Sequence, residues 1–111
     1  MLLYNKQMAY PSKYKDAQVE ILGEPGTARQ LTAGSASSNT VLTSTTRRIS
    51  IRAVGADIRF SIGAGAQTAN GNTSNFIANG ERLDFAVPIG AQIAVIRDGT
   101  VNGTLELTEL I

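Results

Sequence analysis

Residues 46–63 read Thr-Arg-Arg-Ile-Ser-Ile-Arg-Ala-Val-Gly-Ala-Asp-Ile-Arg-Phe-Ser-Ile-Gly. In the first half of this stretch, apolar residues at positions 49, 51 and 53 alternate with polar residues at 48, 50 and 52. The alternation resumes at position 58 with Ile, Arg, Phe, Ser and Ile. Successive side chains of a strand point to opposite faces, so a period of two indicates a half-buried strand. We predict two antiparallel strands joined through Gly55, each with one face towards a core and one towards water.

Other short runs predict the remaining walls of that core. The run at 91–97 is almost continuously apolar, which is typical of a central strand covered on both sides. At 82–87 and 104–110 apolar and polar residues alternate cleanly, and the three phenylalanines of the chain, at 60, 76 and 85, all fall at positions predicted to face inward. Further strands are expected at 18–21, 29–32, 40–43 and 75–78.

Turn-forming residues separate these runs. Loops are expected at 23–26, 33–39 and 64–74, and around Asp98-Gly99 and Asn102-Gly103. Asn79-Gly80 is the strongest hairpin signal in the chain, because both residue types tolerate the positive φ angles of a tight type I′ turn. We therefore predict a hairpin between the strands at 75–78 and 82–87.

About eight short strands and no sustained helical periodicity predict an all-β fold. Long interior connections favour a jelly-roll-like β-sandwich of antiparallel strands over a simple meander. The chain has 111 residues, the size of one domain, and shows no internal repeat. We expect an extended N-terminal arm at 1–15 and one β domain at 16–111.

The arm has a composition of its own. It holds every lysine and every tyrosine of the chain, whereas from residue 16 onward there are seven arginines and nine acidic residues. Tyrosine gives a large contact area at a low entropic cost, so a contact arm for a protein partner is one interpretation. An arm packed on its own domain is the other. The candidate partner-binding residues of the arm are Tyr4, Lys6, Tyr10, Lys13, Tyr14 and Lys15.

Residues suited to catalysis or metal binding are scarce. The chain has no cysteine, the usual thiolate ligand, and no histidine, the usual imidazole ligand and general base. Glu81 and Asp84 are three residues apart, as are Glu106 and Glu109, so on strands the members of each pair point to opposite faces. The glycines at 63 and 65 start like a nucleotide-binding fingerprint, but no helix pattern follows. We expect no enzyme activity, cofactor, metal or small-molecule substrate.

Arginines on the central pair of strands are the other candidate contacts. Arg52 and Arg59 both fall on the predicted polar face, and with the arginines at 47 and 48 they are expected to form a basic strip. Such a strip pairs with carboxylates of a partner, or it is a set of solvated charges that protect a sheet edge.

Other partners are disfavoured by composition. The net charge of +1 and inward-facing phenylalanines argue against nucleic acid, and the lack of an aromatic platform outside the core argues against sugars. The first residues do not resemble a signal peptide, and no apolar run is long enough to cross a bilayer, so we expect synthesis in a cytoplasm and no membrane partner.

Five segments resemble small structural proteins of tailed phages. They are Asp57–Gly63, Gly65–Thr68, Phe76–Asp84, Ile93–Arg97 and Leu105–Leu110, and they lie within the stretch 56–110, which is about half of the chain. Together with the chain length and the tyrosine-bearing arm, they make the sequence similar to the capsid decoration, or staple, proteins of epsilon-fifteen-like short-tailed bacteriophages. These motifs are strand and turn patterns rather than site chemistry.

The resemblance implies a jelly-roll domain on the outer surface of an icosahedral virion, made in the host cytoplasm. It implies a homodimer that clamps neighbouring major capsid proteins against the pressure of the packaged DNA, and it brings no catalytic residues. Two alternatives remain: a carbohydrate-binding jelly roll for attachment to the host surface, and a structural component of the tail or neck.

Overall fold

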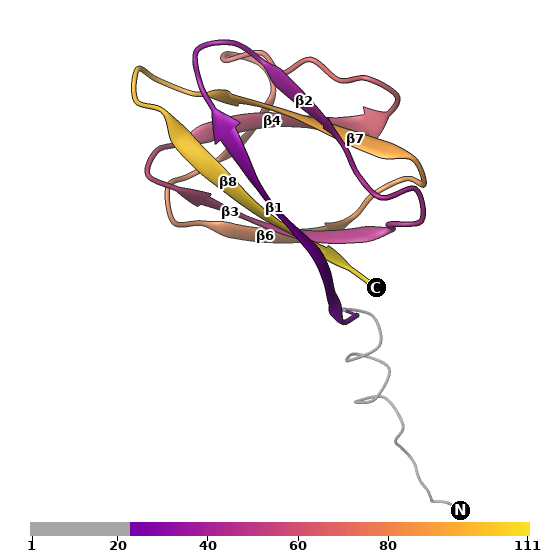
Figure 1. Ribbon diagram of the computed structural model, residues 1–111. Helices are drawn as coiled ribbons and strands as arrows, with labels where there is room; N and C mark the ends of the chain where they lie inside the picture. Colours follow the sequence, from indigo (N-terminus) through magenta and orange to yellow (C-terminus); the bar gives the residue numbers. More distant parts are fainter. Residues whose placement is uncertain (1–22) are drawn as a thin grey trace, which may run out of the picture.

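The computed structural model describes residues 23–111, so the arm at 1–15 and the strand expected at 18–21 lie outside the described residues. Eight strands form two antiparallel four-stranded sheets, which pack face to face as a β-sandwich (Figure 1). The all-β prediction is confirmed, and residues 23–111 contain no helix. The strands are β1 (Pro25–Ala33), β2 (Ser38–Val41), β3 (Arg48–Val54), β4 (Ile58–Ala64), β5 (Asn75–Ile77), β6 (Arg82–Ala86), β7 (Ala91–Arg97) and β8 (Gly103–Leu110).

The strand pairing is nested. One sheet has the order β1-β8-β3-β6 and the other the order β2-β7-β4-β5. The first strand therefore pairs with the last, the second with the seventh, the third with the sixth and the fourth with the fifth. Only the connection from β4 to β5 stays within one sheet, and every other connection crosses to the opposite sheet.

The prediction that the two central strands pair with each other is wrong, because the connection between them crosses from one sheet to the other. Ile51 and Ile58 face the core as expected, but β3 and β4 belong to different sheets and do not pair with each other. At the crossing, Gly55 has a φ angle of +93° and donates its N–H to Oδ1 of Asn79 at 2.9 Å. Alternation reveals the buried face of each strand, whereas two strands that face each other across a core alternate in the same way as two neighbours in one sheet.

The predicted Asn79-Gly80 hairpin is wrong for the same reason. β5 and β6, on either side of it, lie in different sheets. Gly80 does adopt the expected positive φ angle, +85°, and its N–H donates to the carbonyl of Ala53 at 2.7 Å. The Asn79 N–H donates to Oδ1 of Asp57 at 2.8 Å. The turn at 79–80, in the connection from β5 to β6, is thus held by hydrogen bonds to the connection from β3 to β4 and to the end of β3.

Replacing Gly80 with alanine is expected to lower the free energy of unfolding by about 1 kcal/mol, because a Cβ atom is disfavoured at positive φ. No atom lies within 4 Å of the position that the added Cβ would take, so the effect isolates the backbone. Gly99→Ala is the matched control, since that site is equally open and has no positive φ angle. Urea unfolding of both variants measures the difference, and equal stabilities would contradict the assignment.

The core lies between the inner faces of the two sheets. Its largest fully buried side chains come from five strands: Ile49, Ile51, Ile58, Ile77, Ile93, Val95, Leu105 and Leu107. The central position of β7, between β2 and β4, is confirmed, and Ala94 on its outer side is also buried. One inward prediction is wrong: Phe76 is 44% exposed.

Two strand boundaries also differ from the prediction. β1 begins at Pro25, inside the expected turn at 23–26, where Pro25 faces Leu110 at the start of an irregular register. Proline is tolerated there because β1 is an edge strand. β2 begins at Ser38, inside the expected loop at 33–39, and ends at Val41.

Candidate binding surfaces

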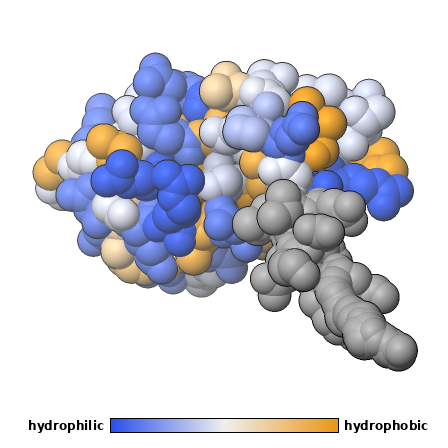
Figure 2. Space-filling model, turned by 90° about the horizontal axis from the view of Figure 1, so that it is seen from below, coloured by the Kyte–Doolittle hydropathy of each residue, from blue (hydrophilic) through white to orange (hydrophobic). Residues whose placement is uncertain are grey.

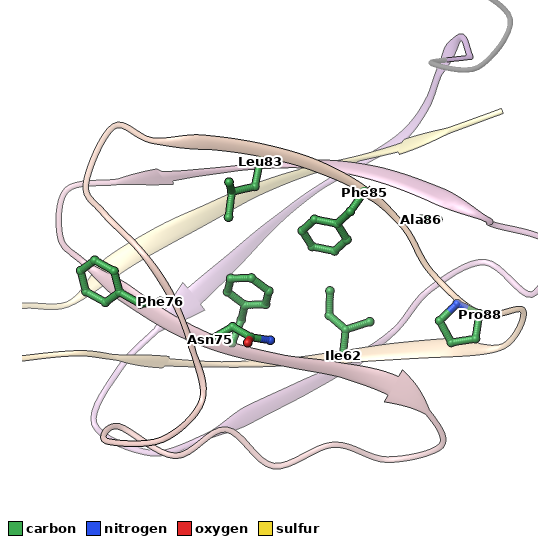
Figure 3. A pocket seen from close by; sticks show the side chains of 8 residues that line it. Ile62, Asn75, Phe76, Leu83, Phe85, Ala86 and Pro88 are labelled. Atoms are coloured by element: carbon green, nitrogen blue, oxygen red, sulfur yellow. The ribbon is translucent and has the colours of Figure 1, made fainter.

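An apolar hollow opens along one side of the sandwich, between the edge strand β6 of one sheet and the strands β4 and β5 of the other. We call it the edge cleft. It has a volume of about 470 Å³. Figure 3 shows Leu83 and Phe85 projecting from β6 towards Ile62 on the facing sheet, with Phe76 and Pro88 at opposite ends. Its lining is Phe60, Ile62, Asn75, Phe76, Leu83, Phe85, Ala86 and Pro88.

The edge cleft is a continuation of the core to the surface. The rings of Phe60 and Phe85 stack with centroids 5.9 Å apart and an angle of 7° between their planes. Phe60 is buried, whereas Leu83 and Phe85 are only partly buried and pack against the core from the cleft side. Aromatic and aliphatic groups at such an opening are suited to bind an apolar side chain of a partner rather than to do chemistry.

At one end of the cleft, Phe76 is held by Arg59. The Arg59 guanidinium lies over the Phe76 ring, 5.0 Å from its centroid. The same side chain donates to Oδ1 of Asp98 at 2.8 Å and to the carbonyl of Ser74 at 3.0 Å. Arg59 therefore ties the outer face of β4 to β5 and to the loop that follows β7. The exposed Phe76 ring therefore has a partner in the Arg59 guanidinium, although it lies outside the core.

The predicted basic strip does not include Arg59. Arg52 is exposed on the outer face of β3, and Arg59 lies on the outer face of β4, in the other sheet. The two guanidinium groups thus lie on opposite sides of the sandwich. Figure 2 shows that the underside of the molecule is mainly hydrophilic, with hydrophobic residues in small separate groups. The six arm residues proposed as contacts lie outside the described residues.

A second, more polar hollow surrounds the buried carboxylate of Glu109. Its volume is about 380 Å³, and it lies between the end of β8 and the loop from β2 to β3. Glu109 is only 3% exposed; it accepts hydrogen bonds from Oγ1 of Thr46 at 2.5 Å and from Nε of Arg29 at 2.7 Å. The backbone N–H of Thr43 adds a longer contact at 3.4 Å.

These contacts set the ionisation of Glu109. Burial alone raises the pKa of this carboxyl, but the hydrogen bonds from Thr46, Thr43 and Arg29 outweigh burial and hold the pKa below its ordinary value. A carboxylate that stays ionised and has its oxygens occupied is suited to hold a loop in place. It is poorly suited to donate or accept a proton in catalysis.

Neither hollow was predicted from the sequence, although the sequence contains a signal for the hollow around Glu109. Glu109 continues the inward series of Leu105 and Leu107, so the alternation of β8 had already placed a carboxylate inside. The edge cleft left no such signal, because it depends on which strands end the two sheets.

Residues 23–111 contain no group of three or more carboxylates that could hold a metal ion. No helix in the same part of the chain is long and apolar enough to cross a membrane. Comparison with models of known protein families, with curated proteins and with solved structures finds no match to this chain.

Proposed function

We propose that this chain is a virion structural protein, a capsid decoration or staple protein that dimerises on the outer surface of a phage head. In this proposal it clamps neighbouring major capsid proteins and so stabilises the DNA-filled shell. The observation that carries the proposal is a β-sandwich with an apolar opening, the edge cleft, whose aromatic and aliphatic lining is typical of a protein contact. The resemblance of five of its segments to phage structural proteins directs the choice of partner.

The strand order supports the jelly-roll part of this proposal. Nested pairing of the first strand with the last, and so inward to β4 and β5, is what a long hairpin gives when it rolls up into two sheets. A decoration protein needs a stable body and surfaces that contact its neighbours, and it needs no reactive group. Many copies on one shell make modest single contacts sufficient through avidity.

The test is binding of the purified protein to capsids that lack it. Deleting residues 2–15 is expected to leave the β domain folded, as measured by circular dichroism. It is expected to weaken capsid binding by at least about tenfold, because several contact residues are lost. Undiminished binding would contradict the arm's role.

Two variants separate the contributions of the tyrosines and the lysines of the arm to capsid binding. One variant changes Tyr4, Tyr10 and Tyr14 to serine, and the other changes Lys6, Lys13 and Lys15 to glutamine. Loss in the first variant alone indicates apolar contacts, whereas loss in the second alone, together with a strong dependence on salt, indicates charge.

A second candidate function is carbohydrate binding for attachment to a host surface. The observation that favours it is Phe76, an exposed ring at one end of the edge cleft. An exposed aromatic ring offers an apolar face on which a sugar can stack. Binding on a broad glycan array that is lost on Phe76→Ala would favour this function, and no binding to any glycan would exclude it.

A further inference from the structure

No strand among residues 23–111 pairs with the outer edge of β6, which lies beside the edge cleft. We call it the free edge of β6, and the backbone groups that point to it can be identified. In the pairing of β6 with β3, Val87 donates its N–H to the carbonyl of Arg47 at 2.8 Å, and Ala53 donates to the carbonyl of Glu81 at 3.2 Å. Both contacts continue the register of β3 and β6, which runs from Arg48 opposite Ala86 to Arg52 opposite Arg82, by one residue at each end. In an antiparallel pair such contacts recur at every second residue. The odd-numbered residues of β6 therefore bond to β3, and residues 82, 84 and 86 direct their N–H and C=O groups to the free edge.

The side chains at this edge carry opposite charges. Arg82 and Asp84 are both exposed on the outer face, two residues apart, with Leu83 between them on the inner face. If β6 pairs in antiparallel fashion with a second β6, a twofold axis at Leu83 places each Arg82 opposite the partner's Asp84. The residues whose backbone groups are free are then the residues that carry the complementary charges.

We propose that two copies of this chain associate through antiparallel pairing of β6 with β6 of the second copy, centred on Leu83. The pairing forms roughly four backbone hydrogen bonds from residues 82 and 84 of the two copies. It joins the two β1-β8-β3-β6 sheets into one. This inference rests on the homodimer of the proposed function and names its interface.

The charges select one register. A shift of two residues in one direction brings Asp84 opposite the partner's Asp84, and a shift in the other direction brings Arg82 opposite the partner's Arg82. Like charges directly opposite each other destabilise a strand pair. A shift of one residue would place the inner face of one strand next to the outer face of the other, which a half-buried sheet does not tolerate.

The same axis brings the two edge clefts together. Leu83 and Phe85 project from β6 into the cleft (Figure 3), so Leu83 meets the partner's Leu83 across the axis. Directly opposed residues that do not exchange hydrogen bonds have Cβ atoms about 4.5–5.5 Å apart, within contact distance for leucine. Partly exposed apolar groups of both copies are thereby covered.

The other edges are less suitable. β1 begins with Pro25 and an irregular register, and its outer residues Ala28, Gln30 and Thr32 carry no charge that selects a register. β5 has three residues and β2 has four. Charges also protect strand edges against pairing. On β6, however, the two charges are complementary in a self-pairing register rather than repulsive.

The test uses charge reversal at two exposed positions of the full chain. Arg82→Asp alone makes both charges of the edge negative, and Asp84→Arg alone makes both positive. Two cross-strand pairs then change from attractive to repulsive, so each variant is expected to dimerise at least about tenfold more weakly than the wild type. The double variant R82D/D84R exchanges the charges and is expected to dimerise like the wild type. Sedimentation velocity over a range of concentrations measures the dissociation constants.

Mixing gives the decisive result. An equimolar mixture of the Arg82→Asp and Asp84→Arg proteins restores opposite charges at both positions, so it is expected to form a mixed dimer that neither protein forms alone. Glu24→Arg, at the start of the opposite edge of the same sheet, changes the net charge as much as Asp84→Arg and is expected to have no effect. A wild-type chain that stays monomeric, single variants that dimerise like the wild type, or a mixture that stays monomeric would each overturn the interface.

Binding of the same proteins to capsids distinguishes this inference from the proposed function. If the charge variants dimerise normally and the wild type binds capsids, the interface is wrong and the function stands. If the mixed dimer forms and the wild type does not bind capsids, the interface stands and the function is wrong.

Discussion

Replacing Ile51 with alanine is expected to destabilise the sandwich by about 3–4 kcal/mol, within the range for large-to-small changes in a core. Ile51 is fully buried in the middle of β3, where it faces Leu83 on one neighbouring strand and Leu107 on the other. Leu83 and Leu107 are both held in place by the backbone hydrogen bonds of their strands. They cannot move together to fill the cavity that the substitution leaves. For a domain of this size, such a loss is a large part of the total stability.

The control is Val54→Ala in the same strand, where the side chain is exposed. Its expected effect is below about 0.5 kcal/mol, as for a surface substitution. Urea unfolding followed by circular dichroism gives both values. Similar losses for the two variants would mean that the inner face of β3 is not the wall of the core.

Replacing Glu109 with alanine is the second large change, with an expected loss of about 2–4 kcal/mol at neutral pH. The substitution leaves the part-buried Arg29 guanidinium and the buried Thr46 hydroxyl without their shared acceptor. Removing one member of such a set costs the desolvation of the groups that remain. Glu106→Ala is the matched control, because Glu106 lies on the outer face of the same strand, where it accepts an exposed hydrogen bond from the Gln30 amide.

The same carboxylate makes stability depend on pH. The folded-state pKa of Glu109 lies below its unfolded value, so its contribution is present above the unfolded pKa of about 4.3 and is lost as the pH falls through the folded pKa. The wild type should therefore lose more stability than Glu109→Gln between neutral and acidic pH. Parallel curves for the two proteins would contradict an ionised Glu109 in the folded state.

The buried face of most strands could be predicted from the sequence, because burial on one side imposes a period of two. β3, β8 and most of β4 follow their alternation in the structure. The partners of the strands could not be predicted in this way. Gly55 and Gly80 were correctly placed in turns, but a turn with a positive φ angle serves a crossing between sheets as well as a hairpin.

The candidate surfaces were less predictable than the fold. Phe76 was expected in the core, but it lies opposite Arg59 of β4, whose guanidinium covers the ring and pairs with Asp98. Arg52 and Arg59 were expected on one face because their strands were expected to be neighbours. The edge cleft and the free edge of β6 follow from the strand order alone, which no local pattern encodes.

The number of copies of this chain in purified particles tests the central claim most directly. Quantitative mass spectrometry of virions made by the genome that encodes the chain gives the ratio of this protein to the major capsid protein. A staple over the whole head predicts a copy number comparable with that of the major capsid protein. Only a few copies per particle, as for a connector at a single vertex, or none at all, would contradict the account.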